Sequence, residues 1–178
     1  MGENAVESQL AASLGQMVAG LSRNKKSRAA YVDRLSEALE EMRRAAAELT
    51  EAIDRDAASY DAVVTAFKRP QSDAAETKSR EVAIQTATRR AAEVPLHVAE
   101  RTVALFERIG QLASIAAASM KSDLEVAQLM AAAGAKGALA NVEINLDGIS
   151  DAGYVTSMRA KIATLRERLG EASRTSSA

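Results

Sequence analysis

Residues 29–69 read AAYVDRLSEALEEMRRAAAELTEAIDRDAASYDAVVTAFKR, and this stretch decides the fold. Its apolar residues recur in alternating steps of three and four, which is the heptad spacing of a helix that packs along one face. The apolar seam reads Val32, Leu35, Leu39, Met42, Ala46, Leu49 and Ile53. Pro70 comes next, and the residue before a proline avoids helical backbone angles. The pattern predicts one helix over residues 29–69, about 60 Å long at 1.5 Å per residue.

The next position on this seam is an acid, Asp56. An ionised carboxylate in a dry core costs several kcal/mol unless partners satisfy it. Asp56 either bonds a neighbouring polar side chain and fixes the register of the bundle, or it lines a ligand pocket where the bundle opens. Tyr60 follows four residues later on the same stripe, and Asp54 and Asp61, seven residues apart, share a face one turn on either side. These neighbours favour the pocket.

The rest of the chain also has helical patterns, separated by start and stop signals. Ser72 and Asp73 can cap the next helix, and Pro95 should kink that helix or break it briefly. A last helix is expected to start at Ser150 or Asp151. The sequence predicts an all-α bundle of five or six long helices in a single domain, residues 1–178. In that domain, we expect residues 1–10 to be a non-native or truncated start and residues 171–178 to be a flexible tail.

The helix expected to be most buried begins at Ser122 and Asp123. It is apolar or small on nearly every side over residues 126–146, so neighbouring helices must cover it all round. Gly134 and Gly137 weaken it by about 1 kcal/mol each relative to alanine, and close packing against another helix is the usual compensation. We expect a partner subunit to complete this packing, giving a homodimer.

Four further polar residues bear on a ligand site, and two of them, His97 and Lys136, can be interpreted in two ways. Asn141 and Asn145 lie four apart on the buried helix, and a heteroaromatic ligand would supply the partners that buried amides need. His97 stands between acidic and basic neighbours as a surface residue, or it is catalytic if the bend at Pro95 faces the pocket. Lys136 either extends out of the bundle or contacts an anionic ligand across a dimer.

Composition excludes several classes of function. The 178 residues include no cysteine and one histidine, which argues against disulfides, thiolate metal sites and multi-histidine metal sites. Net charge is −1, and the basic cluster RNKKSR at residues 23–28 is short and has no interleaved aromatics, so nucleic acid is not expected as a partner. No apolar run is long enough for a membrane span and no secretory signal is present, so we expect a cytoplasmic protein.

Five segments resemble, in order and spacing, the cyclodeaminase/cyclohydrolase family of folate enzymes. The resemblance extends from about Ala11 to Leu169. The segments are SLGQMVAGLSRNKK, DRDAASYDAVVTAFKRP, AIQTATRRAAEVPLHVAE, SDLEVAQLMAAAGAKGALANVEINL and the terminal helix.

The resemblance implies an all-α homodimer that uses no metal and no cofactor, with a tetrahydrofolate derivative as substrate. It implies one of two reactions: closure of 5-formiminotetrahydrofolate to 5,10-methenyltetrahydrofolate with release of ammonia, or opening of methenyltetrahydrofolate by water to 10-formyltetrahydrofolate. A formiminotransferase, fused or separate, is an implied partner of the first. In both reactions a proton leaves a nucleophile and another reaches a leaving nitrogen, which carboxylates can accomplish.

The family's motifs fall on particular residues of this chain. Its acidic motif falls on Asp54, Asp56, Tyr60 and Asp61, the predicted catalytic residues, with Asp56 or Asp61 as the proton-transfer group. Tyr60 and the asparagines would orient the pterin, and the lysines would face the glutamate tail. The predicted substrate-binding residues are Lys25, Lys26, Lys68, Ser122, Asp123, Asn141 and Asn145.

The chain departs from the family at its start. The family opens with a Gly-rich stretch of the type Pro-Gly-Gly-Gly-Ser, whereas this chain begins MGENAVESQL. If that stretch closes the substrate site, the chain would bind folate weakly. The alternative function is therefore a non-catalytic helical dimer or scaffold that has lost this part of the folate site.

Overall fold

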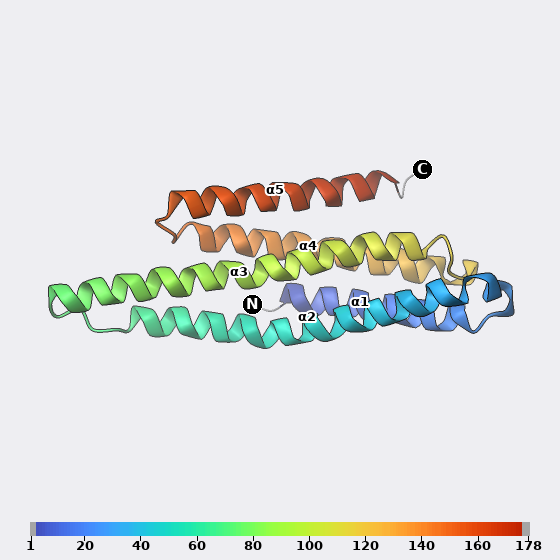
Figure 1. Ribbon diagram of the computed structural model, residues 1–178, viewed down its shortest axis with the longest axis horizontal. Coiled ribbons are helices and arrows are strands. Elements are labelled where there is room, and N and C mark those ends of the chain that lie inside the picture. The colour runs from blue at the N-terminus through green and yellow to red at the C-terminus, as the bar shows by residue number, and fades with distance from the viewer. Residues whose placement is uncertain (1–2, 176–178) are drawn as a thin grey trace.

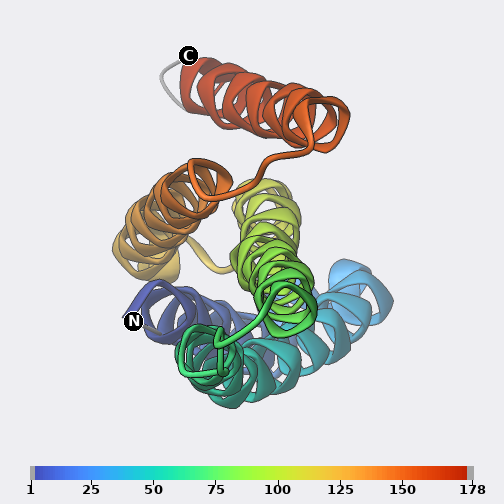
Figure 2. The same cartoon turned by 90° about the vertical axis from the view of Figure 1, so that its left-hand side faces the viewer.

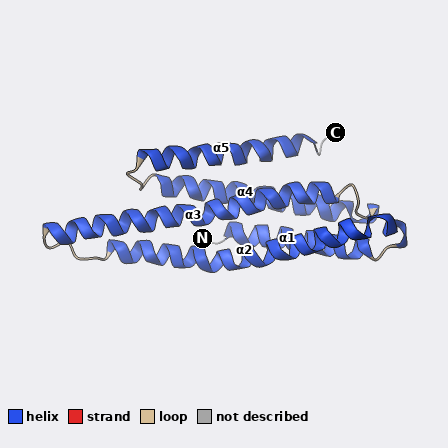
Figure 3. Ribbon diagram, viewed as in Figure 1, coloured by secondary structure: helices blue, strands red, loops and turns tan. Residues whose placement is uncertain are grey.

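The computed structural model of the chain describes residues 3–175. In these residues there are five α-helices, two short 3-10 helices and no strand, so the predicted all-α class is confirmed (Figure 3). The helices are α1 (Glu3–Arg23), α2 (Val32–Phe67), α3 (Ala74–Leu112), α4 (Lys121–Leu146) and α5 (Ala152–Thr175), with η1 (Lys26–Tyr31) and η2 (Ala118–Met120) between them.

Helices α1 to α4 form an elongated antiparallel bundle, and α5 lies outside it against α3 and α4 (Figures 1 and 2). The two longest helices are α2, with 36 residues, and α3, with 39. At the end where they join, both project beyond α1 and α4, so that end of the molecule is a bare helical hairpin (Figure 1). Within residues 3–175, no helix is sufficiently long and apolar to cross a bilayer.

The predicted seam of α2 forms the core over most of its length. Leu35, Leu39, Met42 and Leu49 are buried, whereas Val32 at the start of the helix is exposed. Beyond Asp56 the seam leaves the core, because Tyr60 is 48% exposed and Phe67 is 52% exposed. The seam is therefore interrupted where α2 begins to extend past its neighbours.

Two predicted helix caps are present. Asp73 caps α3 by accepting a hydrogen bond at its Oδ1 from the backbone N–H of Glu76 at 2.8 Å, and Glu76 Oε2 accepts one from the N–H of Ser72 at 2.8 Å. Asp151 Oδ1 accepts from the N–H of Tyr154 at 3.0 Å at the start of α5. These side chains satisfy backbone donors that have no partner inside the helix, which fixes where α3 and α5 begin.

The long helices differ in two ways from the predictions. The single helix expected over residues 29–69 is α2 preceded by η1. Of the kink or brief break expected at Pro95, the break does not occur, because α3 is one continuous helix through that residue. Proline has no N–H to donate to the carbonyl of Ala91, one turn earlier. That carbonyl instead accepts a hydrogen bond from Asn145 Nδ2 of α4 at 3.1 Å. The buried oxygen therefore has a donor, and the helix continues.

Helices α1 and α4 cross closely at the two glycines of α4. A Cβ on Gly137 would lie 1.9 Å from Asn4 Oδ1, and one on Gly134 would lie 2.3 Å from Ser8 Oγ. Side-chain atoms of α1 thus occupy the space that any larger residue would need. The predicted close packing at these glycines is confirmed, and it involves residues of the segment 1–10.

The C-terminal end of the described chain is helical. Helix α5 extends to Thr175, inside the segment 171–178 for which the sequence predicts a flexible tail. Residues 176–178 lie outside the described part of the chain.

Candidate functional site

Four helices meet around the carboxylate of Asp56. A cavity of about 10 Å³ lies there, close to the volume that one water molecule needs. It is lined by residues of α1, α2, α3 and α4: Asn4, Ala5, Ala52, Asp56, Pro95, Val98, Ala138 and Asn141. The structure therefore brings together two of the predicted site residues, Asp56 and Asn141, at a small polar void inside the bundle.

Asp56 is half-buried, and its Oδ2 atom is fully buried with no hydrogen-bond partner in the part of the chain that the structure describes. Ser59 does not satisfy it, because the Ser59 hydroxyl donates to the backbone carbonyl of Asp56 at 2.8 Å. A buried acceptor without a partner costs about 1–3 kcal/mol, and more when it is charged. The register-fixing bond to a neighbouring side chain is thus missing at Oδ2, which remains available to a ligand or a proton.

The two asparagines of α4 have different environments. Asn141 lines the cavity beside Asp56. Asn145 does not, since its Nδ2 donates to the carbonyl of Ala91 at 3.1 Å and to the carbonyl of Asn141 at 2.9 Å. Asn145 therefore has a structural role, because its hydrogen bond links α4 to α3.

Besides Asp56 and Asn141 the cavity has one more polar lining residue, Asn4, which the sequence analysis missed. Asn4 belongs to a segment that was predicted to be non-native or truncated. Its backbone carbonyl accepts from the Ser8 hydroxyl at 2.6 Å, and its side chain lies against Gly137. A usable signal was present: polar Asn4 and Ser8 stand one turn apart on α1, and glycines stand three apart on α4. Pairing the polar residues of α1 with the glycines of α4 requires knowing that the two helices cross.

The other predicted catalytic residues lie on the outer surface of α2. Asp54, Tyr60 and Asp61 are all exposed. At about 100° per residue, Asp54 lies roughly 160° and Asp61 roughly 140° around the helix from Asp56. Within one chain these two acids therefore share a face, as predicted, but they point away from the cavity that Asp56 lines.

The predicted substrate-binding residues are spread along the bundle. Lys25 and Lys26 are exposed at one end, where Lys25 Nζ donates to the hydroxyl of Ser119 at 3.4 Å. Ser122 and Asp123 lie at this end too, in the first turn of α4. Asp56 is about 36 Å along α2 from its start, at 1.5 Å per residue. Within one chain these residues are therefore far from Asp56.

Lys68 is exposed at the other end of the bundle, where it follows the last residue of α2. It lies about 18 Å along the helix axis from Asp56, at 1.5 Å per residue. His97 is exposed on α3, in agreement with its interpretation as a surface residue. Among the described residues, no group of three His, Cys, Asp or Glu side chains could hold a metal ion.

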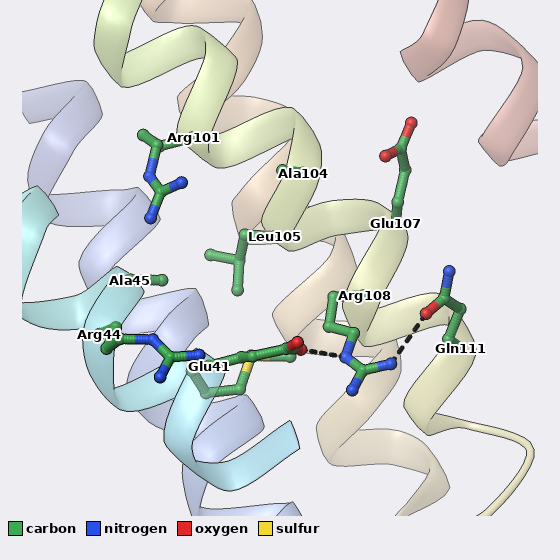
Figure 4. Close-up of a pocket in the computed structure, with 10 residues that line it drawn as sticks. Glu41, Arg44, Ala45, Arg101, Ala104, Leu105, Glu107, Arg108 and Gln111 are labelled. Atoms are coloured by element: carbon green, nitrogen blue, oxygen red, sulfur yellow. Dashed lines mark hydrogen bonds and ion pairs between the residues drawn. The ribbon is translucent and has the colours of Figure 1, made fainter. Parts of the chain in front are cut away.

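A larger groove of about 460 Å³ runs between α2 and α3 (Figure 4). Most of its charged groups have partners: Arg108 pairs with Glu41 and donates to Gln111 Oε1 at 3.0 Å, as the dashed lines in Figure 4 show. Arg101 pairs with Glu48, and Glu107 accepts two hydrogen bonds from Arg168 of α5 at 2.8 and 2.9 Å. We interpret this groove as an ion-pair network that ties α2, α3 and α5 together.

Comparisons with known proteins agree with this architecture. The sequence profile of the family described as formiminotransferase-cyclodeaminase matches residues 2–164, so the similarity begins earlier than Ala11. The formimidoyltransferase-cyclodeaminase of Sus scrofa is 34% identical over 121 residues, covering 68% of this chain and 22% of that protein. The Gallus gallus protein of the same name is 30% identical over 169 residues, covering 95% of this chain and 31% of that protein. The chain thus spans only about a fifth to a third of the length of these relatives.

Two bacterial proteins match over a larger share of their own length. The methenyltetrahydrofolate cyclohydrolase of Methylorubrum extorquens is 29% identical over 180 residues, covering 96% of this chain and 85% of that protein. The crystal structure of a formiminotetrahydrofolate cyclodeaminase from Thermotoga maritima superposes with a TM-score of 0.85 at 24% identity, covering 96% of this chain and 81% of that one, and shows the same fold. With a family profile that matches residues 2–164, this chain belongs to the formiminotransferase-cyclodeaminase family.

Proposed function

We propose that this chain interconverts one-carbon derivatives of tetrahydrofolate. The reaction is either cyclodeamination of 5-formiminotetrahydrofolate to 5,10-methenyltetrahydrofolate plus ammonia, or hydrolysis of 5,10-methenyltetrahydrofolate to 10-formyltetrahydrofolate. The names of its relatives support both. The observation that carries the proposal is the buried Asp56 Oδ2, unpartnered among the described residues and beside Asn141, in a member of this family.

In the proposed mechanism Asp56 is the proton-transfer group. In hydrolysis it takes a proton from the water that adds to the methenyl carbon and returns it to the ring nitrogen as the carbon–nitrogen bond breaks, while the second proton of that water leaves to solvent as the formyl group forms. In cyclodeamination the formimino group reacts in its protonated form, and Asp56 takes the proton of N10 as the ring closes and gives it to the departing nitrogen, which leaves as ammonia. Asn141 donates or accepts a hydrogen bond at the same void, which fixes the orientation of the reacting group. We propose that neither route needs a cofactor.

The size of the cavity limits how the substrate can lie. Ligand pockets usually measure about 300–1,000 Å³, and the cavity at Asp56 holds about 10 Å³. The proposal therefore places only a water-sized group at Asp56 Oδ2. The pterin lies against the outer, half-exposed flank of Asp56, next to the exposed ring of Tyr60.

Two parallel assays test the proposal and separate the reactions. Loss of methenyltetrahydrofolate absorbance identifies a hydrolase, and its appearance from 5-formiminotetrahydrofolate, with ammonia measured separately, identifies a cyclodeaminase. Heat-denatured protein gives the background rate of each reaction. A folded sample that accelerates neither reaction above this background overturns the proposal.

We also propose that the chain forms a homodimer through α1 and α4. The outer faces of these neighbouring helices carry a row of exposed apolar side chains: Val6, Leu10, Met17, Leu21, Val126, Leu129 and Ile144. Leu129 is 72% exposed and Ile144 is 69% exposed. A monomer rarely leaves so many large apolar side chains of two neighbouring helices in water, and a second copy of the chain would cover them.

Two further expectations remain part of the proposal. A formiminotransferase, fused or separate, is proposed as a partner if the reaction is cyclodeamination, because several relatives carry both names. A cytoplasmic location is proposed from the sequence features described above.

A further inference from the structure

The bare hairpin of α2 and α3 contains a groove distinct from the void at Asp56. It holds about 700 Å³, which lies within the range of small-molecule pockets. Its walls come from residues 62–66 of α2, from Arg69 just after that helix, and from residues 78–90 of α3, toward the end where α2 and α3 join (Figure 1). Alanines form much of its floor: Ala62, Ala66, Ala83 and Ala87.

The groove is lined by three cations and by no carboxylate. Arg69, Lys78 and Arg90 are all exposed lining residues, and among the described residues none of them forms an ion pair at 4.0 Å or less. In the neighbouring 460 Å³ groove, by contrast, Arg101 and Arg108 both pair with glutamates. Three uncompensated positive charges that converge on one hollow repel each other, and an anion would relieve that repulsion.

Several acids lie around the groove without lining it. Asp73 and Glu76 are engaged in capping α3, and Asp61 lies one turn before Thr65 on α2. Glu93 accepts from the Tyr154 hydroxyl at 3.3 Å, and Glu81 and Glu93 line the adjoining cavity next to α5, to which Arg90 also contributes. These carboxylates moderate the local potential, and the groove between α2 and α3 itself remains lined by cations.

The walls of the groove are held in place at their closed end. Arg80 of α3 donates from Nε and Nη2 to the carbonyl of Phe67, each at 3.1 Å, and its guanidinium lies 5.7 Å from the centre of the Phe67 ring. This contact satisfies a carbonyl at the C-terminus of α2 and ties it to the second turn of α3. The three cations are thus presented by a braced pair of helices.

We propose that this groove binds a small oligoanion. The ligand carries two or more carboxylate or phosphate groups, which receive charge-assisted hydrogen bonds from Arg69, Lys78 and Arg90. The hydroxyls of Thr65 and Ser79 line the same walls and can donate to the ligand oxygens. The alanine floor accommodates a short aliphatic backbone between the anionic groups. This assignment is independent of the proposed folate reaction.

Titration calorimetry with citrate and with inorganic triphosphate, at physiological ionic strength, tests the assignment. The wild-type chain should bind at least one of them, and the tighter ligand identifies carboxylate or phosphate as the preferred group. The variant Arg69→Gln/Lys78→Gln/Arg90→Gln should bind at least about tenfold more weakly, a loss of about 1.4 kcal/mol. All three side chains are exposed, so its melting temperature should match the wild type.

The matched control is Arg34→Gln/Arg159→Gln/Lys161→Gln. It removes the same number of positive charges from exposed positions outside the groove and should bind as the wild type does. The assignment is overturned if the wild type binds neither anion, if the groove variant binds as tightly as the wild type, or if the control loses affinity equally. Because folate turnover is not measured, these outcomes stand apart from those of the folate assays.

Discussion

Asp56 occupies a position at which an apolar residue would contribute more to the stability of the fold. Its Oδ2 is buried without a partner among the described residues, while Ala52 and Leu49, one and two turns earlier, are buried in the core. A residue that costs stability where it stands is a candidate for function. The choice between a structural and a catalytic Asp56 can therefore be made by measuring stability and turnover on the same variant.

The variant Asp56→Asn should lower kcat by about 10²- to 10⁴-fold, the range that proton transfer by a positioned side chain contributes. Its melting temperature should stay the same or rise, because a neutral amide replaces a carboxylate with a buried, unpaired oxygen. Asp54→Asn and Asp61→Asn are matched controls on the outer face of α2 and should retain kcat within a few-fold. Thermal unfolding and steady-state kinetics check both. Full activity with a lowered melting temperature would make Asp56 a structural residue.

The hydroxyl of Tyr154 should ionise at a higher pH than that of an ordinary tyrosine. Burial and the carboxylate of Glu93 raise the pKa of Tyr154 to about 12, from a usual value of 10.0, because both disfavour the phenolate. The folded state therefore holds this proton more tightly than the unfolded state. Its contribution to stability is complete below pH 10 and is lost as pH rises through about 12.

Absorbance of the phenolate measures this titration. In the wild type one of the three tyrosines should ionise near pH 12, and Tyr154→Phe should remove that component while leaving the others unchanged. Glu93→Gln should move it toward the ordinary value. A curve in which removing Tyr154 deletes only a component near pH 10 would contradict the contacts around this hydroxyl.

At the scale of the helices, α3 depends on α4 to pass through Pro95. Asn145 Nδ2 supplies the hydrogen bond that the proline cannot give to the Ala91 carbonyl. Asn145→Ala should cost about 1–3 kcal/mol, the penalty for a buried acceptor left without a donor. In the Pro95→Ala background the backbone N–H returns, so the same substitution should cost clearly less. Chemical denaturation of the four proteins gives this double-mutant cycle, and strictly additive losses would contradict the compensation.

The crossing of α1 and α4 makes a second test at this scale. Gly134→Ala places a Cβ 2.9 Å from the backbone carbonyl oxygen of Asn4, so the crossing must open, at a cost of about 1–3 kcal/mol. Gly20→Ala is the matched control, because its Cβ would meet only Leu39 Cδ1 at 3.8 Å and alanine favours a helix by about 1 kcal/mol. Free energies of unfolding should therefore change in opposite directions. Equal stabilisation by both substitutions would show that the two helices can separate freely.

These elements show what local sequence could and could not predict. The caps at Asp73 and Asp151 and the stop at Pro70 were predictable, because each acts within a few residues of the chain. The unbroken path of α3 was not, because the residue that rescues it, Asn145, is 54 positions away from Ala91. For the same reason the site was predicted in part. The seam and the buried helix pointed to Asp56 and Asn141, whereas Asn4 joins them through a tertiary crossing that periodicity does not contain.

On the scale of the whole molecule, most of the exposed large apolar side chains lie on α1 and α4. The α2–α3 side carries ion pairs and the basic groove, while the outer faces of α1 and α4 carry the exposed apolar row. Helix α4 is apolar or small on nearly every side, so its buried face builds the core and its outer face adds to this row. That distribution explains why α4 shows almost no amphipathic pattern in the sequence, and it gives the molecule one side suited to self-association.

The proposed homodimer can be tested on that side of the molecule. Leu129→Glu together with Ile144→Glu introduces two carboxylates into the centre of the apolar row of α4, where both side chains are more than two-thirds exposed in the single chain. Folding of one chain should be unaffected, but burying two unpaired carboxylates per subunit at an interface should shift the equilibrium toward monomer by several kcal/mol. Sedimentation velocity should show a dimer for the wild type and a monomer for the variant. Val82→Glu is the control, since Val82 is 60% exposed on α3 and lies outside the row, and it should remain dimeric. The proposed homodimer would be contradicted if the wild type sediments as a monomer at all concentrations.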